Sequence, residues 1–223
     1  MNTAARKSSR HHYHRGNVRE DLIAVGKEIL ESENFSALTL RRLTREIGVN
    51  PTNFYNHFLN MDYLFAAIKV DGFTELLRLS RKATEDYSSK PEALRALFRE
   101  YIFFAIKKPN LYRLMFDYYL DFDDHQELKE ITDQAMSDVV ELLYGTDIFD
   151  SSDALSFYKS HPMAVACWST MHGLTHILIG RQIKLKTKSR KEVGEFADSI
   201  VDVLLDGVLD RFRRSAGSRN KAR

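Results

Sequence analysis

The chain has 223 residues, enough for one large domain or for a small domain joined to a larger one; 43% of them are hydrophobic and 29% charged. Because the net charge is only +2, any binding to nucleic acid must come from local charge rather than from a polycationic molecule. The single cysteine, Cys167, excludes an internal disulfide and a metal site built from cysteines.

Neither a targeting segment nor a membrane span is predicted. The first residues lack the apolar core of a signal peptide. The most hydrophobic window, 162–180, contains two histidines and is close to the minimum of ~18 residues for a bilayer span, so a buried helix fits it better. We therefore expect a soluble protein of the cytoplasm that has no membrane partner.

Helical periodicity begins near residue 17. Asn17 and Glu20 have the spacing of a capping box, and apolar residues then repeat on one helix face to about residue 34. Residues 1–15, before this helix, are predicted to form a disordered basic arm. Such an arm can be merely solvated, but beside a DNA-binding module it can follow the phosphate backbone. Its basic residues are Arg6, Lys7, Arg10 and Arg15.

Residues 38–58 have the pattern of two short helices joined by a tight turn. Gly48 is suited to the positive φ of a helix end, and Asn50, followed by a proline, is suited to cap the next helix. Phe54 and Phe58 face one way, so the polar residues between them can face solvent. This is the arrangement of a helix-turn-helix, whose second helix can enter the major groove of DNA.

The chain divides into a helix-turn-helix domain, 16–60, and a larger helical domain, 61–214. Asn60 can cap a long helix that reaches about Asp86 and connects the two. Prolines and polar runs then separate further helices, and no segment alternates like a strand, which predicts an all-α fold. Those helices cover 94–105, 111–120, 128–145, 162–182 and 193–208. The last residues, 215–223, are predicted to form a disordered basic tail.

Residues 17–70 resemble the TetR family of transcriptional repressors. The match rests on Thr39, Leu43, Ile47, Gly48, Val49, Phe54, Tyr55, His57, Phe58, Asp62 and Leu64. Thr44 departs from the usual alanine, which implies slightly altered packing, and Met61 replaces a lysine that holds a phosphate. A weaker match covers 101–116 and 168–173, where a Trp, a His and a Gly resemble the mark of one subgroup's C-terminal domain.

The resemblance implies a set of contacts to double-stranded DNA. By position, the side chains at the backbone are Thr39 and Tyr55, with His57 a further candidate, and Arg41 can reach a base. The start and outer face of the reading helix present Thr52, Asn53 and Asn56. Asparagine suits bidentate pairing with adenine, and a threonine methyl can meet that of thymine. Each residue could instead be an ordinary solvated side chain.

One such module has too few base contacts to find a single genomic site, whereas a dimer reads two half-sites of a palindromic operator ~34–36 Å apart. The resemblance implies a homodimer in which the last two helices of each chain pair in a four-helix bundle. The candidate dimer face on the last helix comprises Val193, Phe196, Ile200, Val203 and Leu204. These apolar stripes could also be intramolecular core.

The larger domain is rich in aromatic residues. Candidates to line a small-molecule site are Phe103, Phe104, Tyr112, Met115, Phe116, Tyr118, Tyr119, Trp168, His172 and His176, although each could be ordinary core. The resemblance implies a repressor that a small effector releases from DNA. Since few arginines or lysines fall in these helices, an apolar effector suits them best. The alternative is a helical regulator or adaptor of the same fold without a ligand response.

Metal and catalytic functions are weaker interpretations. His172 and His176 have the spacing of two metal ligands on one helix face, and His161 could fold back toward them, but pocket or core histidines explain them equally simply. Cys167 and His172 would point to different faces of one helix, and the sequence contains no glycine-rich phosphate loop or nucleophile elbow. We predict no cofactor, no metal and no enzymatic activity.

Overall fold

The computed structural model describes residues 17–145, 153–183 and 189–220, and every regular element in these ranges is helical. The all-α prediction is therefore confirmed. The elements are α1 (Val18–Ser32), η1 (Phe35–Ala37), α2 (Leu40–Glu46), α3 (Pro51–Phe54), α4 (Met61–Thr84), α5 (Lys90–Lys107), α6 (Pro109–Asp117), α7 (Gln126–Tyr144), α8 (Ala154–Ser160), α9 (Pro162–Ile179) and α10 (Arg190–Asn220).

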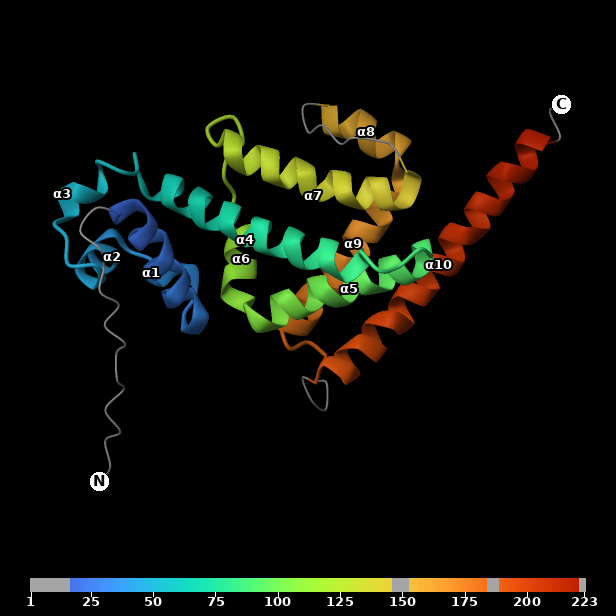
Figure 1. Cartoon of the computed structure of the whole chain (residues 1–223), viewed down its shortest axis with the longest axis horizontal. Helices are drawn as coiled ribbons and strands as arrows, with labels where there is room; N and C mark the ends of the chain where they lie inside the picture. The colour runs from blue at the N-terminus through green and yellow to red at the C-terminus, as the bar shows by residue number, and fades with distance from the viewer. Residues whose placement is uncertain (1–16, 146–152, 184–188, 221–223) are drawn as a thin grey trace, which may run out of the picture.

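Helices α1, α2 and α3 gather at one end of the molecule, and α4 runs from them through its middle (Figure 1). Helix α4 packs against α5 and α7, and α5 in turn packs against α9 and α10. Helix α8 lies outside α7, and the far part of α10 extends away from the other helices (Figure 1). The small and the large helical groups are thus connected by one continuous helix.

The start of α4 is defined by Asn60, as the sequence predicts. Its side-chain oxygen accepts hydrogen bonds from the backbone N–H groups of Asp62, at 2.9 Å, and Tyr63, at 3.3 Å. Two of the four N–H groups without a helical partner are thereby satisfied. Farther along, Lys27 of α1 pairs with Asp71 of α4 at 2.7 Å, and one hydrophobic cluster continues from α1 to α9.

Three details differ from the sequence-based expectations. Asn17 has φ −128° and ψ 46°, away from the extended geometry of a good N-cap, and its side chain makes no capping hydrogen bond within the described residues. Helix α8 was not predicted. Helix α10 continues to Asn220, so 215–220 are helical rather than a disordered tail, because a helix that is already nucleated is extended at low cost even through weak helix formers.

The predicted arm, 1–15, and residues 221–223 lie outside the described residues. None of the helices in the described ranges combines the length and the hydrophobicity that crossing a bilayer requires.

The turn between α2 and α3 depends on Gly48, which has a φ of +71°. A Cβ atom there would have no heavy atom within 4 Å, so the obstacle to a side chain is the backbone conformation alone. We expect Gly48→Val to lower the free energy of unfolding by about 1–2 kcal/mol.

Gly48→Asn serves as the matched control, because asparagine tolerates a left-handed conformation better than valine does. Urea unfolding of both variants checks the prediction, which equal losses of stability would contradict.

Candidate nucleic-acid interface and interior cavity

Helices α2 and α3 are held together by a buried apolar layer. Leu43 and Phe54 are fully buried, and the rings of Phe54 and Phe58 lie 5.5 Å apart. The turn is closed by a 2.9 Å hydrogen bond from the Val49 N–H to the Thr44 carbonyl. Because this layer fixes α3 from behind, the opposite side of α3 is a rigid outer surface.

Most of the polar side chains of the motif lie on that outer surface. Exposed residues are Thr39, Arg41, Arg45, Thr52, Tyr55, Asn56 and His57, whereas Asn53 is half-buried. The Asn56 amide donates a 3.1 Å hydrogen bond to the Asn53 side-chain oxygen, which orients both amides. Arg42 is held in a bidentate pair with Glu33, and Arg45 lies 3.5 Å from the Glu46 carboxylate, whereas the exposed Arg41 has no ion pair among the described residues.

Thr44 and Thr39 have structural roles within this motif. Thr44 is buried, and its hydroxyl donates a 2.9 Å hydrogen bond to the Leu40 carbonyl, so the extra polar atom is satisfied inside the helix. Thr39 caps α2, because its hydroxyl oxygen accepts a 3.3 Å hydrogen bond from the Arg42 N–H. A phosphate contact by Thr39 would be made from the first turn of α2.

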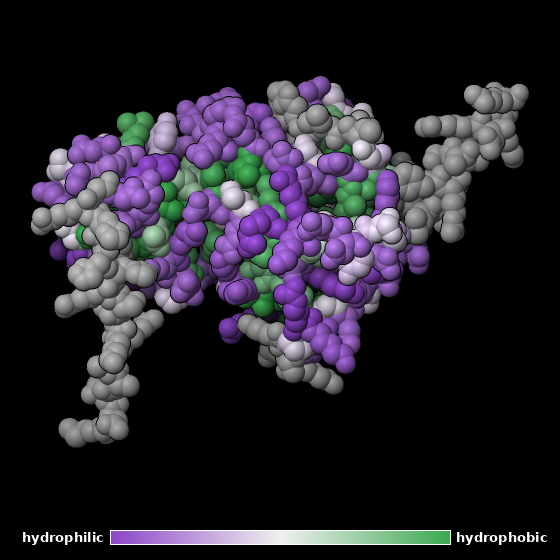
Figure 2. Space-filling view, in the orientation of Figure 1, coloured by the Kyte–Doolittle hydropathy of each residue, from purple (hydrophilic) through white to green (hydrophobic). Residues whose placement is uncertain are grey.

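A large cavity lies among α4, α5, α6, α7 and α9. Its volume is about 1240 Å³, slightly above the usual range of ~300–1,000 Å³ for small-molecule sites. Apolar residues from these five helices line it, among them Phe73, Leu97, Phe116, Val139 and Trp168. Figure 2 shows hydrophobic residues near the middle of one face, in the region between α4 and α7, with hydrophilic residues around them.

One charged side chain is buried in the cavity wall. Lys69 of α4 is only 4% exposed, and its ammonium donates a hydrogen bond to the Tyr118 carbonyl. Burial lowers the pKa of Lys69 to about 8, although the carboxylate of Asp117 opposes this shift. The side chain is therefore mostly protonated at pH 7, a buried cation without a carboxylate at ion-pair distance among the described residues.

Tyr118 connects the cavity with the helix-turn-helix group. It lines the cavity, and its hydroxyl donates a 2.9 Å hydrogen bond to the carboxylate of Asp62 in the first turn of α4. Its ring meets that of Phe35, in η1, edge to face at 5.5 Å and that of Phe65 at 5.0 Å. Three contacts thus converge on one residue that both regions share.

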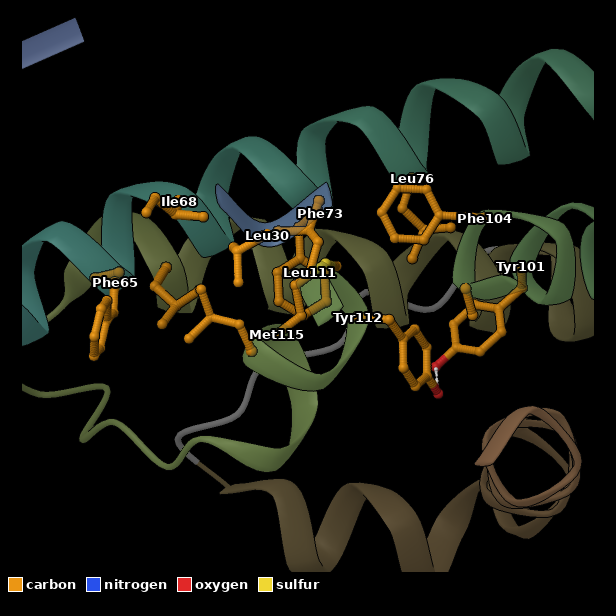
Figure 3. Close-up of a cluster of buried hydrophobic side chains, with 14 of the residues drawn as sticks. Leu30, Phe65, Ile68, Phe73, Leu76, Tyr101, Phe104, Leu111, Tyr112 and Met115 are labelled. Atoms are coloured by element: carbon orange, nitrogen blue, oxygen red, sulfur yellow. Dashed lines mark hydrogen bonds between the residues drawn. The ribbon is translucent and has the colours of Figure 1, made fainter. Parts of the chain in front are cut away.

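A polar cluster lies between α5, α6 and α9, and one of its members, Tyr101, also lines the cavity. The hydroxyls of Tyr101 and Tyr112 are 3.0 Å apart, as the dashed line in Figure 3 shows, and the Tyr112 hydroxyl lies 2.8 Å from Nδ1 of His172. Burial lowers the pKa of His172, and His176 adds to this effect. A neutral imidazole therefore completes a network of satisfied polar groups within an apolar core.

Comparison with known families gives a clear result. Residues 22–68 match the family described as bacterial regulatory proteins, tetR family, and residues 94–204 match the family described as tetracyclin repressor-like, C-terminal domain. The two matches together cover more than half of the 223 residues. The chain belongs to the TetR family.

Solved structures share the TetR fold. A protein of unknown function from Rhodococcus sp. RHA1 superposes with a TM-score of 0.65 and 22% identity, over 86% of this chain and 97% of its own. A TetR-like transcriptional regulator from Rhodococcus sp. RHA1 gives a TM-score of 0.60 at 13% identity, over 87% of this chain and 99% of its own. At these identities the likeness concerns the fold.

The family match identifies the protein as a TetR transcriptional regulator with a DNA-binding helix-turn-helix. The match begins in α1 and ends inside α4, so it contains all of the outer surface described above. The subgroup suggested by Trp168, His172 and Gly173 stays a prediction, as do the individual DNA contacts. The predicted DNA-contacting residues all lie on or directly beside α2 and α3, which are at one end of the TetR molecule (Figure 1).

The predicted ligand-contacting residues divide into two groups. The cavity wall contains Met115, Phe116, Tyr118, Tyr119 and Trp168. Phe103, Phe104, Tyr112, His172 and His176 lie outside that wall, and a ligand contact by them stays a prediction. Phe104 and Tyr112 are buried in the core, as Figure 3 shows. No group of three metal-ligating side chains forms within the described residues.

The predicted dimer face on α10 also divides. Val193 is fully buried inside its own chain, against Ile102 and Leu174, so its assignment to the interface was wrong. Val193, Ala197 and Val201 are spaced four residues apart and form the buried face of α10, which packs against α5. The other predicted interface residues lie on the adjacent face of α10. They are the half-buried Phe196, Ile200 and Leu204 and the exposed Val203.

Lys69 was missed by sequence reasoning, although the sequence contains the signal. It lies four residues after Phe65 and four before Phe73, so the helical period places it on the buried face of α4. A charged residue at such a position is an exception to an amphipathic pattern and indicates a functional position.

We expect Lys69→Met to stabilise the TetR protein at neutral pH. The pKa of Lys69 lies below its unfolded value, so between about pH 8 and 10.5 the unfolded chain binds more protons and the wild type gains stability as pH rises. The advantage of the variant should be on the order of 2–3 kcal/mol at pH 7 and should shrink across that window. Urea unfolding at several pH values measures it.

Lys90→Met is the control for this experiment, because Lys90 lines the same cavity but is exposed. Its effect on stability should not vary between pH 7 and 10. An advantage of Lys69→Met that stays constant over this range would contradict the explanation.

Proposed function

We propose that this TetR protein is a repressor that binds a palindromic operator as a homodimer and leaves it when a small molecule occupies the cavity. The observation that supports DNA reading most directly is the rigid outer surface of α2 and α3. Amide, hydroxyl and guanidinium groups gather there, and the buried rings of Phe54 and Phe58 support them from behind. Such groups suit base edges and phosphates.

The proposed roles follow from where each side chain lies. Thr39, Tyr55 and His57 contact the DNA backbone from the edges of the motif. Thr52, Asn53 and Asn56 lie at the reading face, and Arg41 extends from α2 toward a base. Because Asn53 and Asn56 are hydrogen-bonded to one another, they present a paired donor and acceptor pattern rather than two independent amides.

Asn53→Ala is expected to change sequence preference, with a loss of ~1–3 kcal/mol confined to one or two base pairs of each half-site. Tyr55→Phe, which removes a proposed phosphate contact, should instead weaken binding to all sequences alike. Selection of binding sites from random duplexes, started from the DNA that flanks the protein's own gene, measures both effects. An unchanged preferred sequence in Asn53→Ala would remove Asn53 from the reading set.

The proposed homodimer uses α9 and α10. The outer side of α9 carries the small residues Ala166, Ser169 and Gly173, and all three are exposed. Helix α10 presents Val203, which is 74% exposed, and three half-buried apolar side chains. Small residues allow a second pair of helices to approach closely, and apolar side chains supply the area that a stable interface buries.

Gly173→Leu is expected to convert the protein to a folded monomer with greatly weakened operator binding. A Cβ at Gly173 has no neighbour within 4 Å, so the chain itself tolerates the side chain, whereas a partner helix packed on α9 would not. Light scattering after gel filtration measures the mass. Leu155→Ser, on the exposed surface of α8, is the matched control and should remain dimeric. A dimeric Gly173→Leu would show that the interface lies elsewhere.

The proposed release by an effector rests on the cavity and on Tyr118. A ligand that alters Tyr118 also alters its contacts to Asp62 and Phe35, which belong to the region that carries the reading helix. A ligand shifts the population only by the difference between its affinities for the two conformations. A regulator of this fold without a ligand response is the alternative, and it leaves a cavity of about 1240 Å³ without a role.

A further inference from the structure

Among the cationic side chains in the cavity wall, Lys69 is the buried one without an ion-pair partner. Arg81 forms a bidentate pair with Asp138 at 2.6 and 2.9 Å, and Lys129 pairs with Asp133 at 2.8 Å. The exposed Lys90 donates to the Leu143 carbonyl at 3.0 Å. Lys69 therefore holds a positive charge that, within the described part of the chain, meets the carbonyl and, at 6.0 Å, the ring of Tyr118 but no carboxylate within ion-pair distance.

An ammonium group has three hydrogens to donate, and the Tyr118 carbonyl accepts one of them. No other acceptor for the remaining donors is found among the described residues, and the wall that Lys69 shares with Phe73, Met115 and Phe116 is largely apolar. A buried donor without a partner costs free energy, and the cost is larger for a charged group. The Lys69 position is thus incomplete in its hydrogen bonding.

We propose that the cavity binds a small amphiphile whose single carboxylate pairs with Lys69 and whose apolar body fills the space between α4, α5 and α7. This proposal rests on the effector role proposed above and names the chemistry of that effector. One unpaired cation matches one negative charge, whereas a phosphate dianion would leave a second charge buried without a partner.

The acidic residues of the cavity wall do not oppose this assignment. Asp133 and Asp138 already pair with lysine and arginine, respectively, and the remaining carboxylates are exposed: Asp121, Asp123 and Glu141. Repulsion from exposed charges is weakened by water and salt, whereas attraction to a buried ammonium is much less screened.

The same contact explains how such a ligand reaches the DNA-binding end. A carboxylate that takes the open donors of Lys69 attracts the ammonium toward the ligand and so weakens its hydrogen bond to the Tyr118 carbonyl, and Tyr118 also carries the hydrogen bond to Asp62 and the ring contact to Phe35. A weaker hold on Tyr118 therefore alters a residue on which the first turn of α4 and η1 both depend. The ligand's carboxylate, rather than its apolar body, is the group that alters this junction.

The test compares dodecanoate with dodecan-1-ol, two probes with the same apolar chain, by calorimetric titration of the full-length protein without DNA. Wild type should bind dodecanoate at least about tenfold more tightly than the alcohol. Lys69→Met should lose this preference while it still binds dodecan-1-ol, and Lys69→Arg should keep it. Lys90→Met, a control in the same cavity, should also keep it. A preference that survives in Lys69→Met overturns the proposal.

A second measurement tests the coupling. Dodecanoate should weaken operator binding by the wild type by about 5–150-fold, and in Tyr118→Phe, which lacks the hydroxyl that holds Asp62, it should still bind but weaken operator binding less. If both probes bind equally and both release DNA, the carboxylate proposal fails while the effector role stands. If the protein binds no operator at all, the proposed function fails whatever the calorimetry shows. Failure of dodecanoate to bind the wild type overturns the carboxylate proposal.

Discussion

The convergence of three contacts on Tyr118 connects the two ends of this molecule. A hydroxyl bonded to Asp62, a ring against Phe35 and a carbonyl bonded to Lys69 belong to one residue, which follows α6 directly. Because Tyr118 contacts both the first turn of α4 and η1, the proposed release by an effector has a route to the helix-turn-helix besides α4 itself.

Close packing around α4 favours movement of its neighbouring helices between distinct arrangements. Gly72 lets Met115 of α6 approach so closely that a Cβ at Gly72 would lie 2.6 Å from the Met115 sulfur. Asn110 of the same helix donates a 3.1 Å hydrogen bond to the Leu30 carbonyl of α1. Helix α6 is therefore fixed to both α1 and α4 near the cavity. Tightly packed helices of this kind shift between alternative arrangements rather than deform gradually.

The sequence allows prediction of features that depend on neighbouring residues, but not of features that depend on contacts between distant helices. The helix-turn-helix was predictable because its determinants are local: Gly48 for the turn, Asn50 and Asn60 for the caps, and apolar residues at helical spacing. The division of the aromatic residues between cavity wall and core was not predictable. Tyr112 and Phe116 are four residues apart on α6, yet only Phe116 reaches the cavity, because the direction from which α5 and α9 cover α6 decides it.

The same reasoning applies to α10. An apolar stripe in the sequence indicates that another surface covers the helix, but it does not say which surface. Val193 and Val203 have the same side chain, yet Val193 is buried and Val203 is exposed, because α5 packs against only one face of α10. Lys69 is a different case. Its exception to the apolar pattern of α4 was visible in the sequence, but its significance required the cavity, the Tyr118 carbonyl and the separation from Asp117.

The energetics of Lys69 give the final argument for a ligand at that position. A methionine would fill a similar volume beside Met115 and Phe116 without an unsatisfied charge, and stability alone would favour it by an amount on the order of 2–3 kcal/mol. The lysine therefore weakens the fold in the absence of a ligand. A bound carboxylate would satisfy the open donors and favour the charged ammonium. The destabilisation caused by the buried lysine is thus relieved only by a ligand that carries a carboxylate, which makes binding selective. A position that is unfavourable to the empty protein and favourable with one class of ligand is suited to a sensor.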